Sequence, residues 1–593
     1  MNTIRDILGK LSTMGKSGPV LDEPQRFLLL SIIIGIFSGL VVVCFHISIE
    51  LLNWITIHSL APGAKYLTPL WPALGGVAAY LLVFFVVPTA RGTGVNYTKT
   101  AVYASDGYIP FRSVLGKFAT CTLSIGTGNP MGPEDPALQM GAGIASLLGR
   151  IFHLTREHMR LIAPIGAAAG IGAAFNTPIA AVLFVMEEVM SAWNAGVLGS
   201  IVLSSVSAVV VSRWFLGDEV LYQVPEIEVG DYSELLLYAA IGAVGGWLSA
   251  LFCRYSIMLR GRILKLRERR RLWLPAVAGL AVGIVGTYAP ETLGAGYQVI
   301  DGALHDRFAW NVLLILGLLK LLSTALCFGC GTPGGLFAPT LFVGAMLGGG
   351  LAGLAQLVWP LSTSSVAAYV LVGIGVFFAG VFRAPMTSVF MVFELSASYV
   401  VILPVMIANT IAILVSRRME HDSVFQMAAY QDGLDLPSIE DRRETPALNV
   451  EDAMQRTRDL VVSDRISVAE ALKTIESSDA DALLVEVRYG QWRWVGKREL
   501  ERAKDNGDED SSLHKAMKMW PVVRTYPDLP LDQALRKLAI YPALPVTSRV
   551  NPSFLLGTLT LADVHRAYGI TRQEPKAEAS RVATPPVPGA PQG

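Results

Sequence analysis

Charge is scarce in this sequence. Only 16% of the 593 residues are Asp, Glu, Lys or Arg, and the 48 basic side chains balance the 48 acidic ones. Soluble globular domains usually carry about 25% charged residues, so the composition argues against a wholly soluble protein. The balanced charge also gives no support for a nucleic-acid partner, and we predict none. We expect lipid to surround most of the chain.

Cysteine is scarce as well, with five residues in the whole sequence, and their scatter argues against a disulfide framework. Cys327 and Cys330 form a C-x-x-C pattern, but no second pair or neighbouring His completes a zinc site. We predict no metal and interpret both as small apolar side chains. No nucleophile–base set or phosphate-binding loop accompanies a soluble catalytic domain. We therefore predict that the protein is not an enzyme and requires no cofactor.

Apolar runs take the place of charge: 52% of the residues are hydrophobic, and the mean hydropathy is +0.47. The runs recur from residue 27 to about residue 415, and several are long enough to cross ~30 Å of hydrocarbon as helices. Others are short and broken by Gly and Pro, which predicts helices that end inside the protein. We predict an all-α polytopic membrane domain over residues 27–418, after a cytoplasmic N-terminal segment over residues 1–26 that is not a signal peptide.

A basic segment indicates the orientation in the membrane. Residues 254–271 carry eight Lys and Arg side chains between two apolar runs. A short basic loop of this kind is expected on the cytoplasmic side, and the alternative, an RNA-binding patch, is disfavoured. We therefore predict a multi-pass protein of the cell membrane whose C-terminal region is cytoplasmic.

The composition changes after Arg418, where charged residues become frequent. We predict a linker over residues 419–448, two similar α/β units over residues 449–569, and a disordered, Pro-rich tail over residues 570–593. Each unit contains, in order, a Met, a pair of Val residues, an Ala-Leu pair that starts a helix, and an apolar strand, such as residues 483–487. The units resemble a cystathionine-β-synthase-type (CBS) domain pair. Such pairs bind adenine nucleotides or stabilise dimers, and the sequence leaves both roles open.

An internal repeat is the most informative feature of the apolar region. Residues 132–136 (GPEDP) match residues 335–339 (GLFAP) at an offset of 203 residues. Downstream, residues 174–178 (AFNTP) match residues 381–385 (VFRAP) at an offset of 207, and a Glu follows each segment nine residues later. Two motif pairs in the same order predict duplicated halves of inverted topology, whose broken helices meet near the bilayer midplane.

Each G-x-x-x-P motif is typical of a helix start, because Gly lets the backbone turn closely and Pro fits the first turn without wasting a donor. The free N–H groups of two such starts, one from each half, would offer partial positive charge to an anion. Without a buried Lys or Arg, this favours a site that binds an anion and also releases it. A purely structural role is the alternative for either motif alone. The residues that define the motifs are Gly132, Pro136, Gly335 and Pro339.

These motifs resemble those of the CLC family of anion channels and transporters. The family's G-x-F-x-P is intact at residues 335–339, its G-R-E-G-P is similar to residues 132–136, and its G-S-G-I-P is similar to residues 92–96 (GTGVN). Its inner Tyr falls in a stretch that resembles residues 423–426 (SVFQ). The resemblance covers residues 27–430 and implies a CLC-type membrane domain, assembled as a homodimer with one pathway in each protomer.

The resemblance also implies roles for single residues. Glu134 would be the external gate, whose ionised carboxylate fills the anion pathway and whose protonated form swings away; a structural ion pair is the alternative. A carboxylate inside a membrane is by default a functional hypothesis. Glu188 would transfer protons on the inner side, with Glu187 as a second candidate, although its repeat counterpart Glu394 favours a structural role for Glu187. The anion-binding residues would be Thr93, Gly94, Leu336, Phe337 and Phe425.

Four residues depart from the family pattern. Thr93 replaces Ser and keeps a hydroxyl donor, whereas Phe425 replaces Tyr and removes one, which predicts looser anion binding and weaker proton coupling. Asn96 replaces Pro and changes the stiffness of the loop. Asp135 replaces Gly beside the gate, where it either repels anions or makes Glu134 easier to protonate; the sequence leaves both open.

We predict proton-coupled exchange of chloride, because an inner proton-transfer Glu serves an antiporter and not a channel. The alternatives are a passive chloride channel gated by voltage or protons, an antiporter for fluoride or nitrate, and a CBS-regulated cation transporter. The last would need Asp, Asn and carbonyl clusters in the membrane, whereas helix N-termini dominate the repeated motifs. The expected partners are chloride or another small anion, protons, membrane lipid and a second copy of the chain.

Overall fold

The computed structural model describes most of the chain. The described residues are 23–58, 67–190, 195–217, 222–225, 234–358, 365–434, 436, 448–456, 460–477, 482–487, 491–549 and 554–568. They form two compact units, Met1–Ile439 and Glu440–Gly593. The predicted tail over residues 570–593 and most of the predicted N-terminal segment lie outside the described residues.

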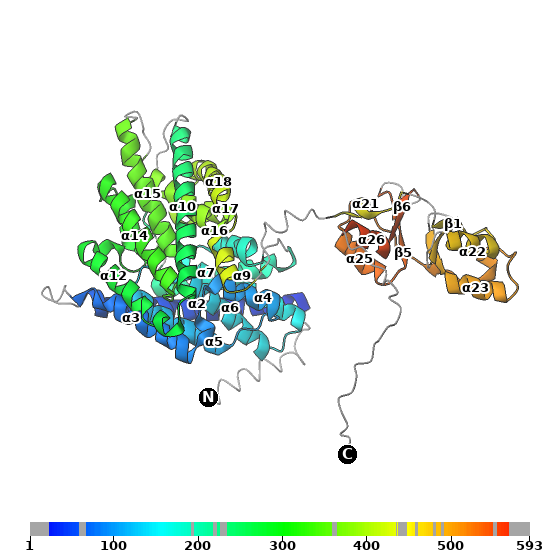
Figure 1. Ribbon diagram of the computed structural model, residues 1–593, viewed down its shortest axis with the longest axis horizontal. Helices are drawn as coiled ribbons and strands as arrows, with labels where there is room; N and C mark the ends of the chain where they lie inside the picture. Colours follow the sequence, from blue (N-terminus) through cyan, green and yellow to red (C-terminus); the bar gives the residue numbers. More distant parts are fainter. Residues whose placement is uncertain are drawn as a thin grey trace, which may run out of the picture. The chain divides into compact units, whose positions relative to one another are not determined.

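The first unit is helical and has two halves that follow the same order along the chain, blue to cyan and then green to yellow in Figure 1. The first half contains α2 (Glu23–Asn53), α3 (Leu70–Leu81), α4 (Gly94–Ala104), α5 (Phe111–Gly126), α6 (Glu134–Ile151), α7 (Arg156–Phe175), α8 (Pro178–Phe184) and α9 (Ala195–Leu216). The second half contains α10 (Leu235–Leu264), α11 (Glu268–Arg271), α12 (Leu274–Tyr288), α13 (Tyr297–Leu304), α14 (Trp310–Cys330), α15 (Phe337–Val358), α16 (Val366–Phe382), α17 (Pro385–Ser396) and α18 (Ile402–Met419).

The repeated motifs mark corresponding helices of the two halves. The G-x-x-x-P motifs open α6 and α15, and the Pro of the second motif pair opens α8 and α17. Counterparts also meet each other: α3 packs on α12, and α8 packs on α17. This is the packing expected when a two-fold axis relates the halves.

Small residues bring neighbouring helices close together in both halves. A Cβ atom added at Gly141 on α6 would lie 2.1 Å from the carbonyl oxygen of Gly166 on α7, and one at Gly344 on α15 would lie 2.4 Å from that of Gly373 on α16. Such contacts between backbones are typical of helices packed in a membrane, where apolar burial adds little to helix association. The same contact therefore recurs at corresponding places of the two halves.

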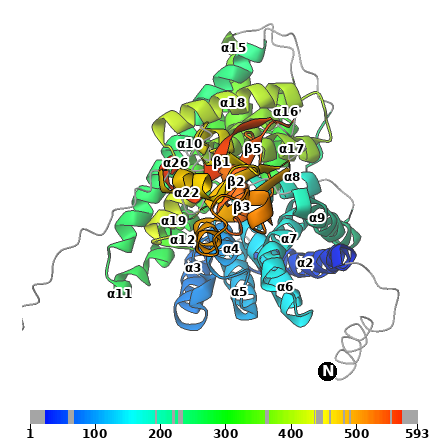
Figure 2. The same cartoon turned by 90° about the vertical axis from the view of Figure 1, so that its right-hand side faces the viewer.

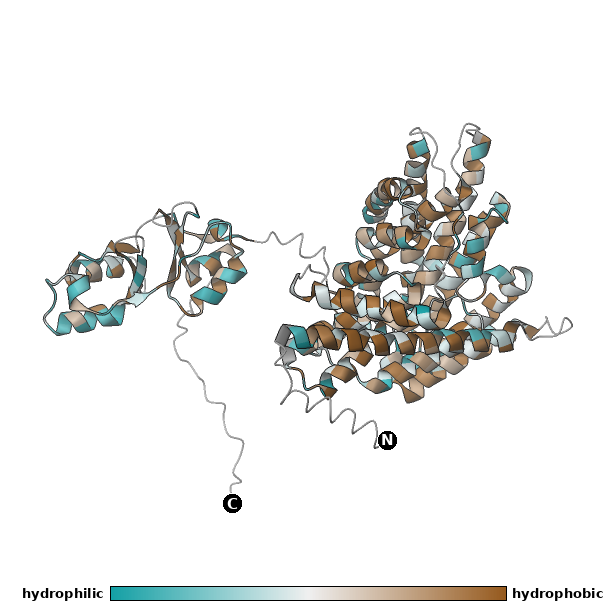
Figure 3. Ribbon diagram, turned by 180° about the vertical axis from the view of Figure 1, so that it is seen from behind, coloured by the Kyte–Doolittle hydropathy of each residue, from teal (hydrophilic) through white to brown (hydrophobic). Residues whose placement is uncertain are grey.

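Eight helices of the described part are long and apolar enough to cross a membrane. Figure 3 shows hydrophobic residues in brown along most helices of this unit. A further helix, α19 (Val424–Gln431), packs against α4, α10 and α16. The interval predicted as a linker, residues 419–448, therefore contains a helix of the first unit.

The second unit consists of two successive α/β repeats. In the first, β1 (Val461–Ser463) is parallel to β2 (Ala482–Val487), which is antiparallel to β3 (Gln491–Gly496). In the second, Thr525 forms a parallel bridge with Val546 of β5 (Ala543–Thr547), which is antiparallel to β6 (Leu555–Thr560). The remaining elements are α21 (Val450–Ala453), α22 (Val468–Ser477), α23 (Lys497–Asp505), α24 (Leu513–Ala516), β4 (Trp520–Pro521), α25 (Leu531–Leu538) and α26 (Leu561–Ala567).

Each repeat of the second unit has its own apolar core. Along the chain each repeat has the order strand, helix, two strands, helix, and β4, the first strand of the second repeat, pairs with β3 of the first. Thr560 caps α26, as the sequence predicts. Its hydroxyl accepts from the Asp563 N–H at 3.3 Å, and the Asp563 carboxylate accepts from the Thr560 N–H at 2.9 Å. This reciprocal capping box satisfies donors at the start of the helix.

Candidate anion site between the two halves

The starts of α6 and α15 are joined directly. The N–H of Gly132 donates to the carbonyl oxygen of Gly335 at 2.8 Å, and the N–H of Gly335 donates back to that of Gly132 at 2.8 Å. A Cβ atom at Gly335 would lie 2.7 Å from Cβ of Asp135 and 3.0 Å from the Gly132 carbonyl oxygen. Glycine is therefore required for this approach. The two helix N-termini meet at one point, as the internal repeat predicts.

Glu134 stands at this junction. It is the first residue of α6 and is fully buried. One carboxylate oxygen accepts from the backbone N–H of Ala338, in the first turn of α15, at 3.4 Å. The other accepts from the hydroxyl of Tyr297. The partners of the carboxylate are thus a helix N-terminus and a phenol rather than a cation, so the side chain occupies a place that suits an anion.

Tyr297 is a site residue that the motifs alone do not identify. It is the first residue of α13, and its N-cap is Gly296. Gly294 and Gly296 repeat the Gly92 and Gly94 of the first half at an offset of 202 residues. This G-x-G repeat is the signal in the sequence that could have led to Tyr297.

Asp135, next to Glu134, does not point into an open pathway. Its carboxylate accepts from the N–H groups of Gly94 at 2.7 Å and Val95 at 2.9 Å, and so caps the start of α4. This cap fixes the position of the Asp135 carboxylate, and its effects on anions and on Glu134 stay predictions. Because the N–H of Gly94 donates to Asp135, it is not available to an anion in this arrangement, and the anion-binding role of Gly94 stays a prediction.

Two buried lysines support the turns that lead into α4 and α13. Lys117 on α5 donates to the carbonyl oxygens of Ala90 at 3.3 Å and Gly92 at 2.7 Å. Lys320 on α14, at an offset of 203, donates to those of Thr292 at 2.9 Å and Gly294 at 2.5 Å. Each ammonium thus supplies donors for two carbonyl groups of the turn before the helix. Sequence reasoning did not identify this pair of lysines.

Phe337 and Phe425 lie together on one side of the junction. Their rings are 5.9 Å apart, and Phe382 stacks on Phe425 at 5.1 Å. Asn96 on α4 donates from its side-chain amide to the carbonyl oxygen of Phe425 at 2.8 Å. Asn96, expected only to alter loop stiffness, therefore ties the start of α4 to α19.

Thr93 is buried at the N-cap of α4, where its hydroxyl oxygen accepts from the Asn96 N–H at 3.4 Å. This bond uses a lone pair of the oxygen and not the hydroxyl proton. Leu336 is buried in the motif immediately before α15. Thr93 thus lies at the start of α4, which Asn96 links to Phe425 on α19. The ring of Phe425 in turn lies near that of Phe337 on α15.

Glu187 is a helix cap. It lies on the turn Val185–Val189 after α8 and accepts from the N–H groups of Met386 at 3.0 Å and Thr387 at 2.9 Å, at the start of α17. In the same way, Glu394 on α17 caps the start of α8: its carboxylate accepts from the N–H groups of Ile179 at 2.9 Å and Ala180 at 2.7 Å. Figure 2 shows α17 beside α8. The structural reading of Glu187 is therefore favoured over proton transfer.

Glu188, the next residue, has a different partner. Its carboxylate forms an ion pair with the ammonium of Lys99 on α4 at 3.1 Å, and the two side chains are 12% and 4% exposed. Breaking a buried pair by removing one partner is costly, because the other charge is left uncompensated. Lys99 was not identified from the sequence. Any proton carried by Glu188 must compete with this ion pair.

Comparison with known families places the site in context. Residues 75–417 match the family model described as "Voltage gated chloride channel". A putative chloride channel protein, ClcB-like, from Ralstonia nicotianae is 33% identical over 392 residues, which cover 63% of this chain and 90% of the relative. The H(+)/Cl(-) exchange transporter ClcA of Vibrio cholerae is 28% identical over 423 residues, covering 69% of this chain and 90% of the relative.

Solved structures share the fold. A slow cyanobacterial Cl-/H+ antiporter has a TM-score of 0.63 at 23% identity and covers 69% of this chain and 98% of its own. A CLC-type fluoride/proton antiporter has a TM-score of 0.59 at 22% identity, covering 68% and 97%. A eukaryotic CLC transporter has a TM-score of 0.60 at 20% identity and covers 91% of this chain and 98% of its own, so this similarity extends beyond the first unit.

Proposed function

The chain belongs to the voltage gated chloride channel family, and on this basis we propose that it exchanges chloride for protons across a membrane. One observation carries the proposal: a buried carboxylate, that of Glu134, lies on the N-terminus of α15 where the two halves meet. Relatives named as chloride/proton exchangers support the same conclusion.

Glu134 acts in this proposal as a competitor of the transported anion. While ionised, its carboxylate takes the Ala338 N–H and the Tyr297 hydroxyl. Protonation removes the charge that suits a helix N-terminus, and the neutral side chain leaves. A chloride ion then takes the same donors. One proton and one anion therefore compete for one place, and this competition couples their movements.

Glu188 is proposed to exchange protons with the inner side. A carboxylate held by Lys99 is stabilised in its charged form, so proton uptake requires the pair to separate. This requirement makes each proton transfer slow relative to anion movement. The same ion pair favours the second candidate function, a passive anion channel in which Glu188 and Lys99 only join α4 to the turn after α8.

The preferred anion is proposed to be chloride, with fluoride and nitrate as alternatives. A hydroxyl donor remains at Thr93, whereas Phe425 supplies no donor from its side chain. The inner side of the site then binds anions more loosely than one with two hydroxyl groups. Reconstituted protein challenged with each of the three anions would rank them by initial flux.

The decisive experiment measures chloride and proton movement together. Purified protein in liposomes, with a chloride gradient, is followed with chloride and pH electrodes. We expect the gradient to drive protons against their own gradient. Glu134→Gln mimics the protonated gate and should keep chloride flux while losing proton movement, and Glu188→Gln should also lose proton movement. Glu268→Gln, at an exposed position, is the matched control.

The outcomes separate the two functions. Chloride flux without proton pumping by the native protein would establish the passive channel. Normal proton exchange by both Glu134→Gln and Glu188→Gln would show that the two carboxylates are wrongly assigned.

The second unit is proposed to be a cytoplasmic CBS pair, and the protein a homodimer. The tandem strand–helix–strand–strand–helix order of the unit supports the first proposal. The basic segment over residues 254–271 supports the cytoplasmic assignment. Binding of a fluorescent adenine nucleotide to the whole protein tests the ligand, and the mass of the detergent-solubilised protein, measured by light scattering, tests the dimer.

A further inference from the structure

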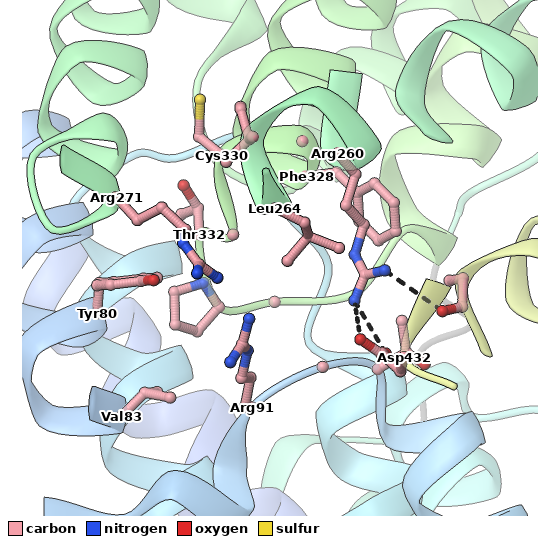
Figure 4. A pocket seen from close by; sticks show the side chains of 18 of the residues that line it. Tyr80, Val83, Arg91, Arg260, Leu264, Arg271, Phe328, Cys330, Thr332 and Asp432 are labelled. Carbon is pink, nitrogen blue, oxygen red and sulfur yellow. Dashed lines mark hydrogen bonds and ion pairs between the residues drawn. The ribbon is translucent and has the colours of Figure 1, made fainter. Parts of the chain in front are cut away.

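A basic cavity lies beside the anion site, outside the junction of α6 and α15. Its volume is about 70 Å³, and it lies between the end of α3, the loop before α4, the ends of α10 and α11, and the loop after α14. Figure 4 shows its side chains. The residues that carry the argument are Gly92, Thr93, Arg91, Arg260, Arg271 and Asp432.

The positive charge of this cavity is only partly neutralised. Arg260 is paired with Asp432: one terminal nitrogen of the guanidinium, Nη2, donates to both carboxylate oxygens, at 2.7 and 2.9 Å. Asp432 is the one acidic residue among the described residues that line the cavity. Two guanidinium groups, those of Arg91 and Arg271, therefore remain without a carboxylate on the cavity wall.

Arg91 and Arg271 come from different halves of the first unit. Arg91 precedes α4, whereas Arg271 ends α11. The Nε–H of Arg271 donates to the carbonyl oxygen of Leu266 at 3.0 Å, which fixes the group and leaves its terminal N–H groups for other partners. In Figure 4 the two guanidinium groups point into the cavity toward one another. Two like charges held in this way repel each other unless an anion lies between them.

We propose that this cavity binds a phosphate group that carries two negative charges. Guanidinium groups match phosphate oxygens with paired N–H donors, better than any ammonium does. A single chloride ion would balance only one of the two arginines. A phosphate monoester satisfies both the charge and the arrangement of paired donors.

A group bound in the cavity affects transport, because Gly92 and Thr93 also line the cavity and Thr93 is a predicted anion-binding residue. A bound dianion lies beside these two residues and repels an incoming anion of the same sign. The phosphate site is thus an inhibitory site at one entrance of the pathway. Arg260 and Arg271 belong to the basic segment over residues 254–271, and short basic loops are expected on the cytoplasmic side. This entrance therefore faces the cytoplasm.

The same chemistry has two sources, a lipid headgroup and a soluble phosphate. Basic pockets between membrane helices on the cytoplasmic side suit phosphorylated headgroups. The experiment therefore has two arms, both with the full chain in liposomes. One adds inorganic pyrophosphate to each side in turn, and the other includes a phosphatidylinositol phosphate in the membrane. Chloride flux is the first readout, and it rests on the proposed function. The second is binding of inorganic pyrophosphate to detergent-solubilised protein by calorimetry, which does not.

We expect at least one arm to inhibit chloride flux, and the arm that does so identifies the source. Arg91→Gln and Arg271→Gln should each weaken inhibition and pyrophosphate binding by about tenfold or more, the effect of losing a hydrogen bond to a charged group. Arg269→Gln is the matched control, since it removes one charge from the same segment at an exposed position that does not line the cavity.

Three results would overturn the inference. These are native flux that neither arm reduces, inhibition that Arg91→Gln and Arg271→Gln leave unchanged, and inhibition that falls equally in Arg269→Gln, which would indicate general screening by surface charge. A native protein that moves no anion contradicts the proposed function instead. In that case calorimetry with Arg91→Gln and Arg271→Gln still decides whether the phosphate site exists.

Discussion

Tyr297 holds the carboxylate of Glu134 in place, and Tyr297→Phe removes that bond while keeping the ring. A hydrogen bond to a charged group contributes about 1.5–3 kcal/mol, which is about tenfold to a hundredfold in an equilibrium. The remaining donor, the Ala338 N–H, is 3.4 Å away and holds the carboxylate weakly. The ionised carboxylate of the variant should therefore be away from the junction about tenfold more often.

The assay is the electrode measurement of chloride and proton flux in liposomes. We expect Tyr297→Phe to raise the chloride flux and to lower the number of protons moved per chloride, because the place shared by anion and carboxylate is open more often. Tyr288→Phe, at a position that is 88% exposed, is the control for loss of a phenol. An unchanged flux and an unchanged ratio in Tyr297→Phe would refute the idea that this hydroxyl holds the gate.

Three further predictions follow from other contacts. Lys99→Met should free Glu188 for protons and raise proton flux several-fold relative to chloride, measured with the same electrodes; a fall in proton flux would contradict a competing ion pair. Gly335→Ala should lose folded protein on size-exclusion chromatography, because its Cβ meets Asp135 at 2.7 Å, whereas Gly199→Ala, with 3.9 Å of space, should behave as the native protein. Glu187→Gln should lower the midpoint of thermal unfolding and leave proton coupling intact, since Glu187 caps α17; lost coupling with an unchanged midpoint would restore its proposed role in proton transfer.

The repeated motifs predicted the most important feature of the fold. Two G-x-x-x-P segments at a constant offset are local signals, and they correctly placed the starts of α6 and α15 at one junction. The position of Glu134 followed from the same motif. These motifs could not predict which residues from distant segments contact Glu134. Tyr297 lies 163 residues from Glu134, and the G-x-G repeat that precedes Tyr297 does not show that the two side chains meet.

Charged residues on apolar helices were the hardest to interpret from sequence. Lys99 gave no sign that it pairs with Glu188, because the contact depends on how α4 packs against the turn after α8. Asp135 was recognised as unusual, but its role as a cap of α4 depends on the approach of a loop that lies 40 residues away. For Glu187 the repeat supplied a counterpart, Glu394, and each of the two carboxylates caps a helix of the other half; a role of Glu187 in proton transfer stays a prediction.

The mutual bonds between Gly132 and Gly335 limit how the protein can move. They join the two halves at the proposed anion site. Transporters that rock one half against the other open a gap between the halves. Here a gap between the starts of α6 and α15 has to break both hydrogen bonds, whereas a swing of the Glu134 side chain breaks neither.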